Sequence, residues 1–349
     1  MIPATMTAAL LTGHGGLDRL SLRDDVPTPV PAPGDVLVRV GAAGVNNTDI
    51  NLRVGWYSKA ADADPSAAAA DAGWTGAPLA FPRIQGADAC GRIIAVGAAV
   101  AAARIGERVL VNPVLYGDGS GAPRYLGSDC DGAFAEFVRV PAANAVRIES
   151  ALSDVELASF PCAYLAAENM LARAGVGATD TVVVTGASGG VGSAAVQLAR
   201  RRGARVLAIA GAAKAAEVAA LGAERVLARD QDLIAALGRG SASVVIDIVG
   251  GRQFGVLLEL LARGGRYAVA GAIAGAEVAL DLRTLYLNDL TLAGCTITAR
   301  GLFETLVVAI ERGEIRPVVS RTYPLSEIAA AQAEFLGKAH VGKIVLVPG

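Results

Sequence analysis

The first 150 residues consist of short apolar runs separated by glycine and proline. Runs rich in valine occupy residues 35–45, 92–100 and 107–114, and short β-branched runs between turn residues are typical of strands. Residues 26–35 contain four prolines and predict an extended loop. Residues 58–80 are rich in alanine, aspartate and glycine without a clear apolar face, so they predict a long surface insertion. This part of the chain therefore predicts a β domain.

From residue 151 the pattern changes to strands that alternate with helices. Ser153, followed by Glu156 three positions later, predicts a capped helix start. Beyond it, four apolar segments each precede a helical segment, at residues 181–186, 205–211, 225–229 and 243–250, and a fifth apolar segment follows at 267–272. Strands with few polar positions, each followed by a helix, predict a parallel sheet that is covered on both faces.

The last part of the chain predicts two helices, over residues 301–315 and 324–339, and a final strand at 343–348. This strand follows the alternating series and has no helix after it. We expect it to return to the first part of the chain and pair with a strand there. Residues 290–297 predict one more strand late in the series.

Composition narrows the class of protein. Of the 349 residues, 53% are hydrophobic and 18% are charged, which excludes disorder over most of the chain because disorder needs low hydrophobicity and high net charge. With 31 basic and 33 acidic residues, the chain has no positive surplus for binding phosphates, so we expect no nucleic-acid partner. The N-terminus lacks a basic segment before an apolar run, and we see no membrane span, so we expect a cytoplasmic protein.

Cysteine and histidine are too few and too scattered for an evident metal site. The four cysteines are at least 32 residues apart, and the two histidines, His14 and His340, lie near opposite ends of the chain. A catalytic zinc usually takes three protein ligands, mostly His and Cys. We therefore expect free thiols and no metal centre.

The segment VVVTGASGGVG at 182–192 carries the strongest chemical signal. An apolar strand leads directly into spaced glycines, and a helical segment follows. This variant of the dinucleotide fingerprint allows a tight turn, close approach of a pyrophosphate and its binding at a helix N-terminus. The alternative is a tight turn without a ligand, which the surrounding βα pattern disfavours. We expect the cofactor phosphates at Gly186, Ser188, Gly189, Gly190, Val191 and Gly192.

The end of the second strand bears on the choice of cofactor. An NAD site places Asp or Glu here to bind the ribose 2′-hydroxyl, but the chain has Ala210, Gly211, two further alanines and Lys214. A 2′-phosphate needs space and a cation, so the sequence favours NADP, bound at Gly211 and Lys214. The alternative is that Lys214 only solvates the start of a helix.

Two later strand ends are also expected to border the cofactor. Val249 and Gly250 end one predicted strand, and Ala270 and Gly271 end the next. Ligands of doubly wound sheets bind outside the carboxyl ends of the strands. These backbones should therefore flank the path from adenosine to nicotinamide.

Seven segments resemble, in order, the medium-chain dehydrogenase/reductase superfamily and its quinone oxidoreductase-like branch. They are GAAGVNNTDINLRVGWY (41–57), FPRIQGADACGRIIAVG (81–97), GERVLV (106–111), DGAFAEFVRVP (131–141), FPCAYLAAENML (160–171), VTGASGGVGSAAVQLA (184–199) and HVGKIVLVP (340–348). The resemblance implies an α/β protein with a GroES-like catalytic domain at 1–150, completed by 298–349. It places an NADP-binding Rossmann domain, a doubly wound parallel sheet, at 151–297. A strand like 290–297 often joins two subunits in this family, so the resemblance also implies a homodimer.

The resemblance bears on the metal as well. Zinc-dependent members carry Cys, His and Cys where this chain has Asn46, Ala87 and Cys162. Two of the three ligands are replaced, and alanine cannot coordinate a metal. The lobe that holds a structural zinc in such enzymes needs four cysteines and here contains only Cys130. The resemblance therefore implies no zinc at either place, with Cys162 a packed core thiol.

Candidate roles follow from positions in the resemblance. The Asn46 amide is expected to donate to a substrate or nicotinamide oxygen, with a turn-stabilising role as the alternative. Thr48 and Asp49 match positions near the nicotinamide. The alternative is that Thr48 only caps a short helix. Tyr57 is expected to polarise the substrate, or else to form a wall of the cleft. Arg229 matches a position beside the 2′-phosphate, the alternative being an exposed arginine at a strand end.

The absence of zinc that the resemblance implies favours one class of reaction over another. Alcohol oxidation without zinc lacks a Lewis acid for the alkoxide, whereas hydride donation to an activated C=C needs less, because the conjugated carbonyl delocalises the charge. The resemblance thus implies an NADPH-dependent reductase of quinones or α,β-unsaturated carbonyls. The alternatives are a metal-free alcohol dehydrogenase and a non-catalytic NADPH-binding protein.

Overall fold

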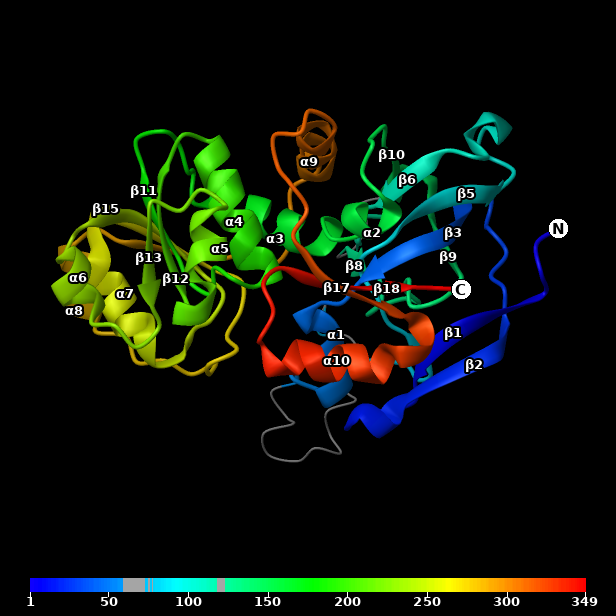
Figure 1. Cartoon of the computed structure of the whole chain (residues 1–349), viewed down its shortest axis with the longest axis horizontal. Coiled ribbons are helices and arrows are strands. Elements are labelled where there is room, and N and C mark those ends of the chain that lie inside the picture. Colours follow the sequence, from blue (N-terminus) through cyan, green and yellow to red (C-terminus); the bar gives the residue numbers. More distant parts are fainter. Residues whose placement is uncertain (59–72, 75, 77, 118–122) are drawn as a thin grey trace. The chain divides into compact units, whose positions relative to one another are not determined.

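The computed structural model describes residues 1–58, 73–74, 76, 78–117 and 123–349, which form two compact units (Figure 1). The predicted insertion at 58–80 lies mostly outside the described residues. Unit 1 comprises Met1–Cys162, Pro317–Ala339 and Lys343–Gly349, and unit 2 comprises Ala163–Arg316 and His340–Gly342.

The units divide later in the chain than the predicted limits of 150 and 297. Helix α2 (Asp154–Leu157) stays with unit 1, where Asp154 pairs with Arg108 of strand β6 (Arg108–Val111). Helix α9 (Leu302–Glu311) belongs to unit 2. A unit is defined by which parts of the backbone lie together in space, and a change in composition along the chain does not report this. The predicted cap of α2 is confirmed, since Ser153 and Glu156 form a capping box.

Unit 1 is built mainly from β-sheets, as predicted. Its largest sheet has the order β10-β6-β5-β3-β18-β17, with β9 also paired to β3, and a smaller sheet has the order β2-β1-β4. The strands of the largest sheet, besides β6, are β3 (Asp35–Gly44), β5 (Cys90–Val96), β9 (Phe137–Pro141), β10 (Ala145–Arg147), β17 (Val319–Pro324) and β18 (Lys343–Val347). The remaining elements of unit 1 are β1 (Thr5–Leu11), β2 (Leu20–Pro27), β4 (Arg83–Ile84), β7 (Val114–Leu115), β8 (Arg124–Tyr125), α1 (Asn47–Val54) and α10 (Ile328–Gly337).

The expected return of the last strand is confirmed. Strand β18 pairs antiparallel with β3, with Val345 opposite Gly44 and Leu346 opposite Ala43, and it lies between β3 and β17 (Figure 1). The apolar side chains of β18 are buried in the core of unit 1 together with those of β3, including Ile344. The position of β18 brings its first residue, Lys343, into the same unit as residues near position 46.

Unit 2 has a six-stranded parallel sheet in the order β13-β12-β11-β14-β15-β16, which confirms the predicted doubly wound fold. The chain reverses its direction of strand addition at β11, where ligands of such sheets bind. Helices α4 and α5 lie on one side of the sheet and α6 and α7 on the other (Figure 1). The strands are β11 (Thr181–Val184), β12 (Arg205–Ala210), β13 (Arg225–Ala228), β14 (Ala242–Asp247), β15 (Leu261–Val269) and β16 (Thr291–Gly294). The helices, besides α9, are the part of α3 (Pro161–Arg173) after Cys162, α4 (Gly190–Arg201), α5 (Ala215–Ala219), α6 (Leu233–Leu237), α7 (Phe254–Leu260) and α8 (Leu282–Leu287).

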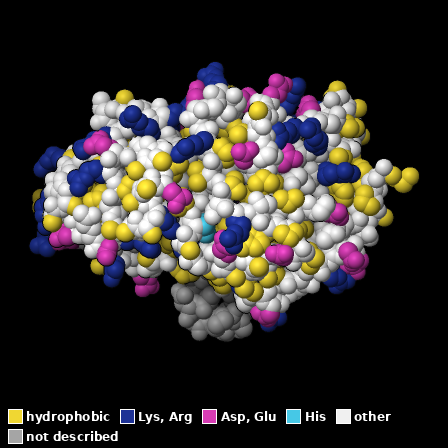
Figure 2. Space-filling model, viewed as in Figure 1, with side chains coloured by type: hydrophobic (Ala, Val, Ile, Leu, Met, Phe, Trp, Pro, Cys, Tyr) yellow, Lys and Arg dark blue, Asp and Glu magenta, His cyan; other side chains and the backbone are white. Residues whose placement is uncertain are grey.

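The surface carries charges of both signs. On the face shown in Figure 2, described lysine and arginine side chains are interspersed with aspartate and glutamate, and neither sign forms one large patch. Within the described ranges, no helix has both the length and the apolar character needed to cross a bilayer.

Candidate functional site

The predicted glycine turn joins β11 to α4 in unit 2. Gly186 has φ +56°, a left-handed conformation that favours glycine. A Cβ on Gly192 would lie 2.2 Å from the Gly186 carbonyl oxygen, so the helix can approach the turn this closely only with glycine at 192. Gly189 is the N-cap of α4 and has no side chain to bond the first N–H groups of the helix. The turn thus presents the backbone N–H groups of the first turn of α4 and a positive helix end, which fit a pyrophosphate.

A buried carboxylate orders the neighbouring strand ends. Asp247, at the end of β14, accepts hydrogen bonds from Thr185 beyond β11, from Tyr267 of β15 and from the backbone N–H groups of Val249 and Gly250. The sequence placed Asp247 at a strand end but did not identify this role. The network fixes the backbone at the carboxyl ends of three adjacent strands, where the cofactor was predicted.

The other predicted strand end lies beside this network. The Ala270 N–H donates to the Asp247 carbonyl oxygen at 3.1 Å. A Cβ on Gly271 would lie 2.7 Å from the Ile248 carbonyl oxygen, so this close approach also requires glycine. These backbones are held together in unit 2, and their contact with a cofactor stays a prediction.

Two cations lie together beyond the ends of β12 and β13. The Arg229 guanidinium lies against Gly211, with Nη2 3.3 Å from where a Cβ on that glycine would stand. Burial, and next the positive charge of Arg229, lower the pKa of Lys214, while Glu217 raises it. Like charges repel when they lie close together. This pair therefore offers a favourable place for a doubly charged phosphate group.

In unit 1, a buried ionic cluster surrounds Asn46. The Lys343 ammonium donates to the Asp88 carboxylate at 2.8 Å and to the side-chain oxygen of Asn46. The Lys343 and Asp88 side chains are 3% and 0% exposed. Asp88 also accepts from the backbone N–H of Cys162 at 2.5 Å. A fully buried ion pair with these bonds holds the start of α1, strand β18 and the segment before β5 in one arrangement.

The predicted role of Asn46 needs correction. Its amide nitrogen donates to Asp88 at 2.8 Å and to the Gly44 carbonyl at 3.2 Å, and its oxygen accepts from Lys343. Both amide hydrogens are therefore used inside unit 1, and none is left for a substrate or a nicotinamide. Asn46 is also the N-cap of α1, so the alternative, a structural role at a turn, describes it better.

The predicted contact of Asp49 with the cofactor also needs correction. Its carboxylate is 1% exposed and accepts from the Asn46 backbone N–H at 2.8 Å, which completes the capping box of α1. Burial raises the pKa of this carboxyl from an ordinary value of 3.8 to about 7, although the bond from Asn46 and the charge of Lys343 lower it. The enclosed Asp49 carboxylate stabilises the start of α1, and a ligand cannot reach it.

This raised pKa predicts a pH dependence of stability. Between about pH 4 and pH 7 the folded state keeps a proton on Asp49 that the unfolded chain has lost, so the contribution of Asp49 to the free energy of unfolding falls as pH rises. We expect Asp49→Asn, which cannot titrate, to lack this fall. Denaturant unfolding of both proteins at several pH values measures the difference. The exposed Asp289→Asn is the control, and a pH-independent difference for Asp49→Asn would contradict the assignment.

Thr48 and Tyr57 lie in different surroundings. The Thr48 hydroxyl oxygen is buried and has no hydrogen-bond partner among the described residues, so it is not a helix cap. Tyr57 packs against Leu11, Leu52 and Leu79. Burial raises the pKa of the Tyr57 phenol well above its ordinary value of 10. This makes it a weaker acid and favours the alternative role as an aromatic wall.

The cysteines lie apart from any cluster of metal ligands. Cys162 is buried and accepts from the Tyr125 hydroxyl at 3.0 Å, and burial raises its pKa to about 12. Tyr125 in turn stacks on Trp74, with ring centroids 4.4 Å apart. Over the part of the chain that the structure describes, no three His, Cys, Asp or Glu side chains are grouped to hold a metal ion.

Sequence reasoning missed Asp88 and Lys343. One signal was present: Lys343 is a lone charge at the start of an apolar strand, KIVLV. A buried lysine almost always has a partner. That partner could not be identified from the chain, because Asp88 lies 255 positions away in sequence.

The chain matches two family models and several known proteins. A model described as "Alcohol dehydrogenase GroES-like domain" matches residues 32–150, and one described as "Zinc-binding dehydrogenase" matches residues 190–312. A solved structure from Sinorhizobium meliloti 1021, described provisionally as an alcohol dehydrogenase, is 50% identical, has a TM-score of 0.93, and covers 100% of this chain and 98% of its own.

Curated relatives differ in their named activities. An NAD-dependent alcohol dehydrogenase of Sulfurisphaera tokodaii is 30% identical over 93% of this chain and 96% of its own. An acryloyl-coenzyme A reductase of Metallosphaera sedula is 29% identical over 98% and 99%. A quinone oxidoreductase of Homo sapiens is 27% identical over 98% of both chains. With the two-unit fold and the glycine turn, these matches show that the chain belongs to the medium-chain dehydrogenase/reductase superfamily and is an oxidoreductase.

Proposed function

We propose that this chain reduces quinones or α,β-unsaturated carbonyls with NADPH and without zinc. The observation that carries the proposal is the Lys343–Asp88–Asn46 cluster. Its ammonium group bonds the side chain at one position where zinc-dependent relatives have a ligand, and Ala87 stands at another. One amide oxygen already bonded to a cation and one thiol bonded to Tyr125 do not fit a catalytic zinc.

The residues of unit 2 fit a dinucleotide. The glycine turn and the uncapped start of α4 would hold its pyrophosphate, and Lys214 with Arg229 would hold a 2′-phosphate. When bound, the nicotinamide supplies the hydride that the reduction requires.

On the substrate side, the proposal assigns a hydrogen bond to Thr48. Its buried hydroxyl has no partner among the described residues and lies in the first turn of α1, where the helix dipole favours negative charge. A donor in this position stabilises the charge that develops on a carbonyl oxygen as hydride arrives at the conjugated carbon. Asn46 and Asp49 hold the start of α1 in place, and solvent is the proposed source of the proton.

The cofactor proposal predicts the effect of removing either cation. We expect Lys214→Ala and Arg229→Ala each to weaken NADPH binding about tenfold, because each removes a charge-assisted bond to the 2′-phosphate. NADH binding should change little, since NADH lacks that phosphate. Titration of both dinucleotides measures this, with Arg225→Ala, an exposed arginine at the other end of β13, as control. Equal loss for NADH and NADPH, or tighter binding of NADH by the unaltered chain, would contradict NADPH use.

A panel of reactions tests the activity itself. With NADPH, we expect turnover of a quinone and of an enal, and little oxidation of a simple alcohol with NADP. The same sample should contain no stoichiometric zinc by elemental analysis. The relatives named alcohol dehydrogenase make metal-free alcohol oxidation the second candidate. Alcohol turnover without reduction of the quinone or the enal would favour it, and stoichiometric zinc would overturn the zinc-free proposal.

A homodimer stays part of the proposal. Strand β16 is the last strand in the order of its sheet, and its Leu292 side chain is 37% exposed. Edge strands of this kind are open to pairing with another chain. Sedimentation velocity at micromolar concentration tests this, and a monomer there would contradict it.

A further inference from the structure

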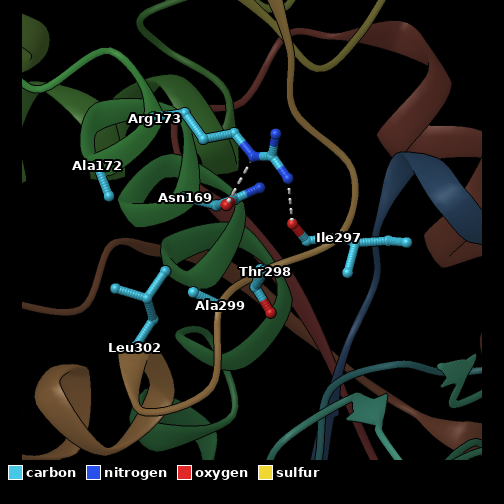
Figure 3. Close-up of a pocket in the computed structure, with 7 residues that line it drawn as sticks. All are labelled: Asn169, Ala172, Arg173, Ile297, Thr298, Ala299 and Leu302. Carbon is cyan, nitrogen blue, oxygen red and sulfur yellow. Dashed lines mark hydrogen bonds between the residues drawn. The ribbon is translucent and has the colours of Figure 1, made fainter. Parts of the chain in front are cut away.

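A pocket in unit 2 is lined by none of the candidate site residues discussed so far. Its volume is about 330 Å³, and it lies between the last turns of α3 and the segment that joins β16 to α9 (Figure 3). The lining residues are Asn169, Ala172, Arg173, Ile297, Thr298, Ala299 and Leu302. None of them belongs to the glycine turn or to the cation pair at Lys214 and Arg229.

The pocket holds an unsatisfied donor. Asn169 is 2% exposed, and its amide nitrogen has no hydrogen-bond partner within the described part of the chain. The amide oxygen accepts from Arg173 Nε at 3.4 Å, which places the oxygen toward the guanidinium and leaves the NH₂ group as the free donor. Figure 3 shows Asn169 and Arg173 extending from α3 toward the segment of Ile297 and Thr298. A buried donor without a partner calls for an acceptor from outside the chain.

The charge around this donor is positive. Arg173 donates a second N–H to the Ile297 carbonyl oxygen at 2.9 Å. A guanidinium has five N–H donors in all. The lining residues include no carboxylate, and Glu168, next to Asn169, is bound in a bidentate pair to Arg202. Helix α9 begins at Leu302 after Gly301, which has no side chain to cap it, although Glu304 lies in the first turn. A positive helix end, a guanidinium and an amide NH₂ together favour an anionic acceptor.

We propose that this pocket binds a short aliphatic carboxylate. The carboxylate oxygens accept from the Asn169 amide and the Arg173 guanidinium, and the alkyl chain lies against Ala172, Ala299 and Leu302. The mostly apolar lining suits a molecule with an alkyl chain better than a free inorganic anion. The assignment does not depend on the substrate that the enzyme reduces.

Binding of butyrate and of its neutral isostere butyramide tests the proposal. Ligand-detected NMR on the full chain should show butyrate binding, about tenfold tighter than butyramide. Asn169→Leu, which keeps the side-chain size but removes the donor, and Arg173→Gln should each weaken butyrate binding about tenfold. The control Arg312→Gln alters an exposed arginine at the other end of α9 and should leave butyrate binding unchanged. Dinucleotide binding should be unaltered in all three variants.

Several results would overturn the proposal. They are the absence of butyrate binding at about 50 mM, equal binding of butyrate and butyramide, or unweakened butyrate binding by Asn169→Leu and Arg173→Gln. Ala299→Phe fills the pocket from the connecting segment without touching α3, so it serves if a variant in α3 does not fold. It should abolish butyrate binding and keep dinucleotide binding. Failure of the quinone and enal assay would not bear on these outcomes.

Discussion

Lys343→Met should lower the free energy of unfolding by about 3–5 kcal/mol, because it leaves the Asp88 carboxylate buried without its cation. The remaining bonds to Asp88, from Asn46 and from the Cys162 backbone, are hydrogen bonds without a full positive charge. Removing one partner of a buried pair costs more than the pair itself contributes, since the stranded charge cannot be solvated. Denaturant unfolding followed by circular dichroism measures the change.

A double variant separates the stranded charge from a simple loss of packing. Lys343→Met combined with Asp88→Asn removes both charges, and we expect it to recover a large part of the stability lost by Lys343→Met. The matched control is Arg263→Met, which breaks a pair with Asp289 whose side chains are 72% and 66% exposed. An exposed pair contributes about 0–1 kcal/mol. A loss for Lys343→Met no larger than for Arg263→Met would mean that water reaches the cluster.

Gly192→Ala should weaken binding of both NADPH and NADH about a hundredfold. The new Cβ would meet the Gly186 carbonyl oxygen at 2.2 Å and the Ala187 Cα at 2.7 Å, and both are backbone atoms that cannot move aside cheaply. The start of α4 must then shift relative to the turn, and displacements of about 1 Å at a binding site are enough for losses of this size. Dinucleotide fluorescence titration measures the affinities.

Alanine substitutions at two other glycines serve as comparisons for Gly192→Ala. A Cβ on Gly189 would meet the Gly186 oxygen at 3.5 Å, an ordinary contact, so Gly189→Ala should bind the dinucleotide much better than Gly192→Ala. Gly255, in α7, has nothing within 4 Å of an added Cβ. Gly255→Ala should leave binding unchanged and stabilise the helix by about 0.5–1 kcal/mol. If Gly192→Ala bound dinucleotide as well as Gly255→Ala, the phosphates would not rest on this turn.

The glycine turn and the cation near the end of β12 could be predicted because each depends on a few residues that are neighbours in sequence. The glycine turn is one continuous stretch from 182 to 192. The spacing of its glycines indicates the positions at which two backbone segments approach each other closely. Lys214 was proposed in the same way, since it lies shortly after a strand that the apolar pattern had located, whereas Arg229, which follows β13, was proposed from the family resemblance. Their closeness to each other was visible only in the structure.

The roles of Asn46 and Asp49 were mispredicted for a physical reason. A side chain's chemistry depends on which of its hydrogens and lone pairs are already used, and those partners come from Gly44, Asp88 and Lys343. Residue type and position in a motif do not show which hydrogen-bonding groups of a side chain already have partners. The unpartnered hydroxyl of Thr48 and the unpartnered amide of Asn169 could be recognised only once every neighbour was placed.

The sequence by itself determined the two kinds of sheet and the turn between β11 and α4. Each of these follows from the period of apolar residues and from glycine and proline, which act over a few positions. The tertiary structure alone decided the limits of the units, the pairing of Lys343 with Asp88 and the donors left free at Thr48 and Asn169. These depend on contacts between residues up to 297 positions apart in sequence, and such contacts arise only when the chain has folded.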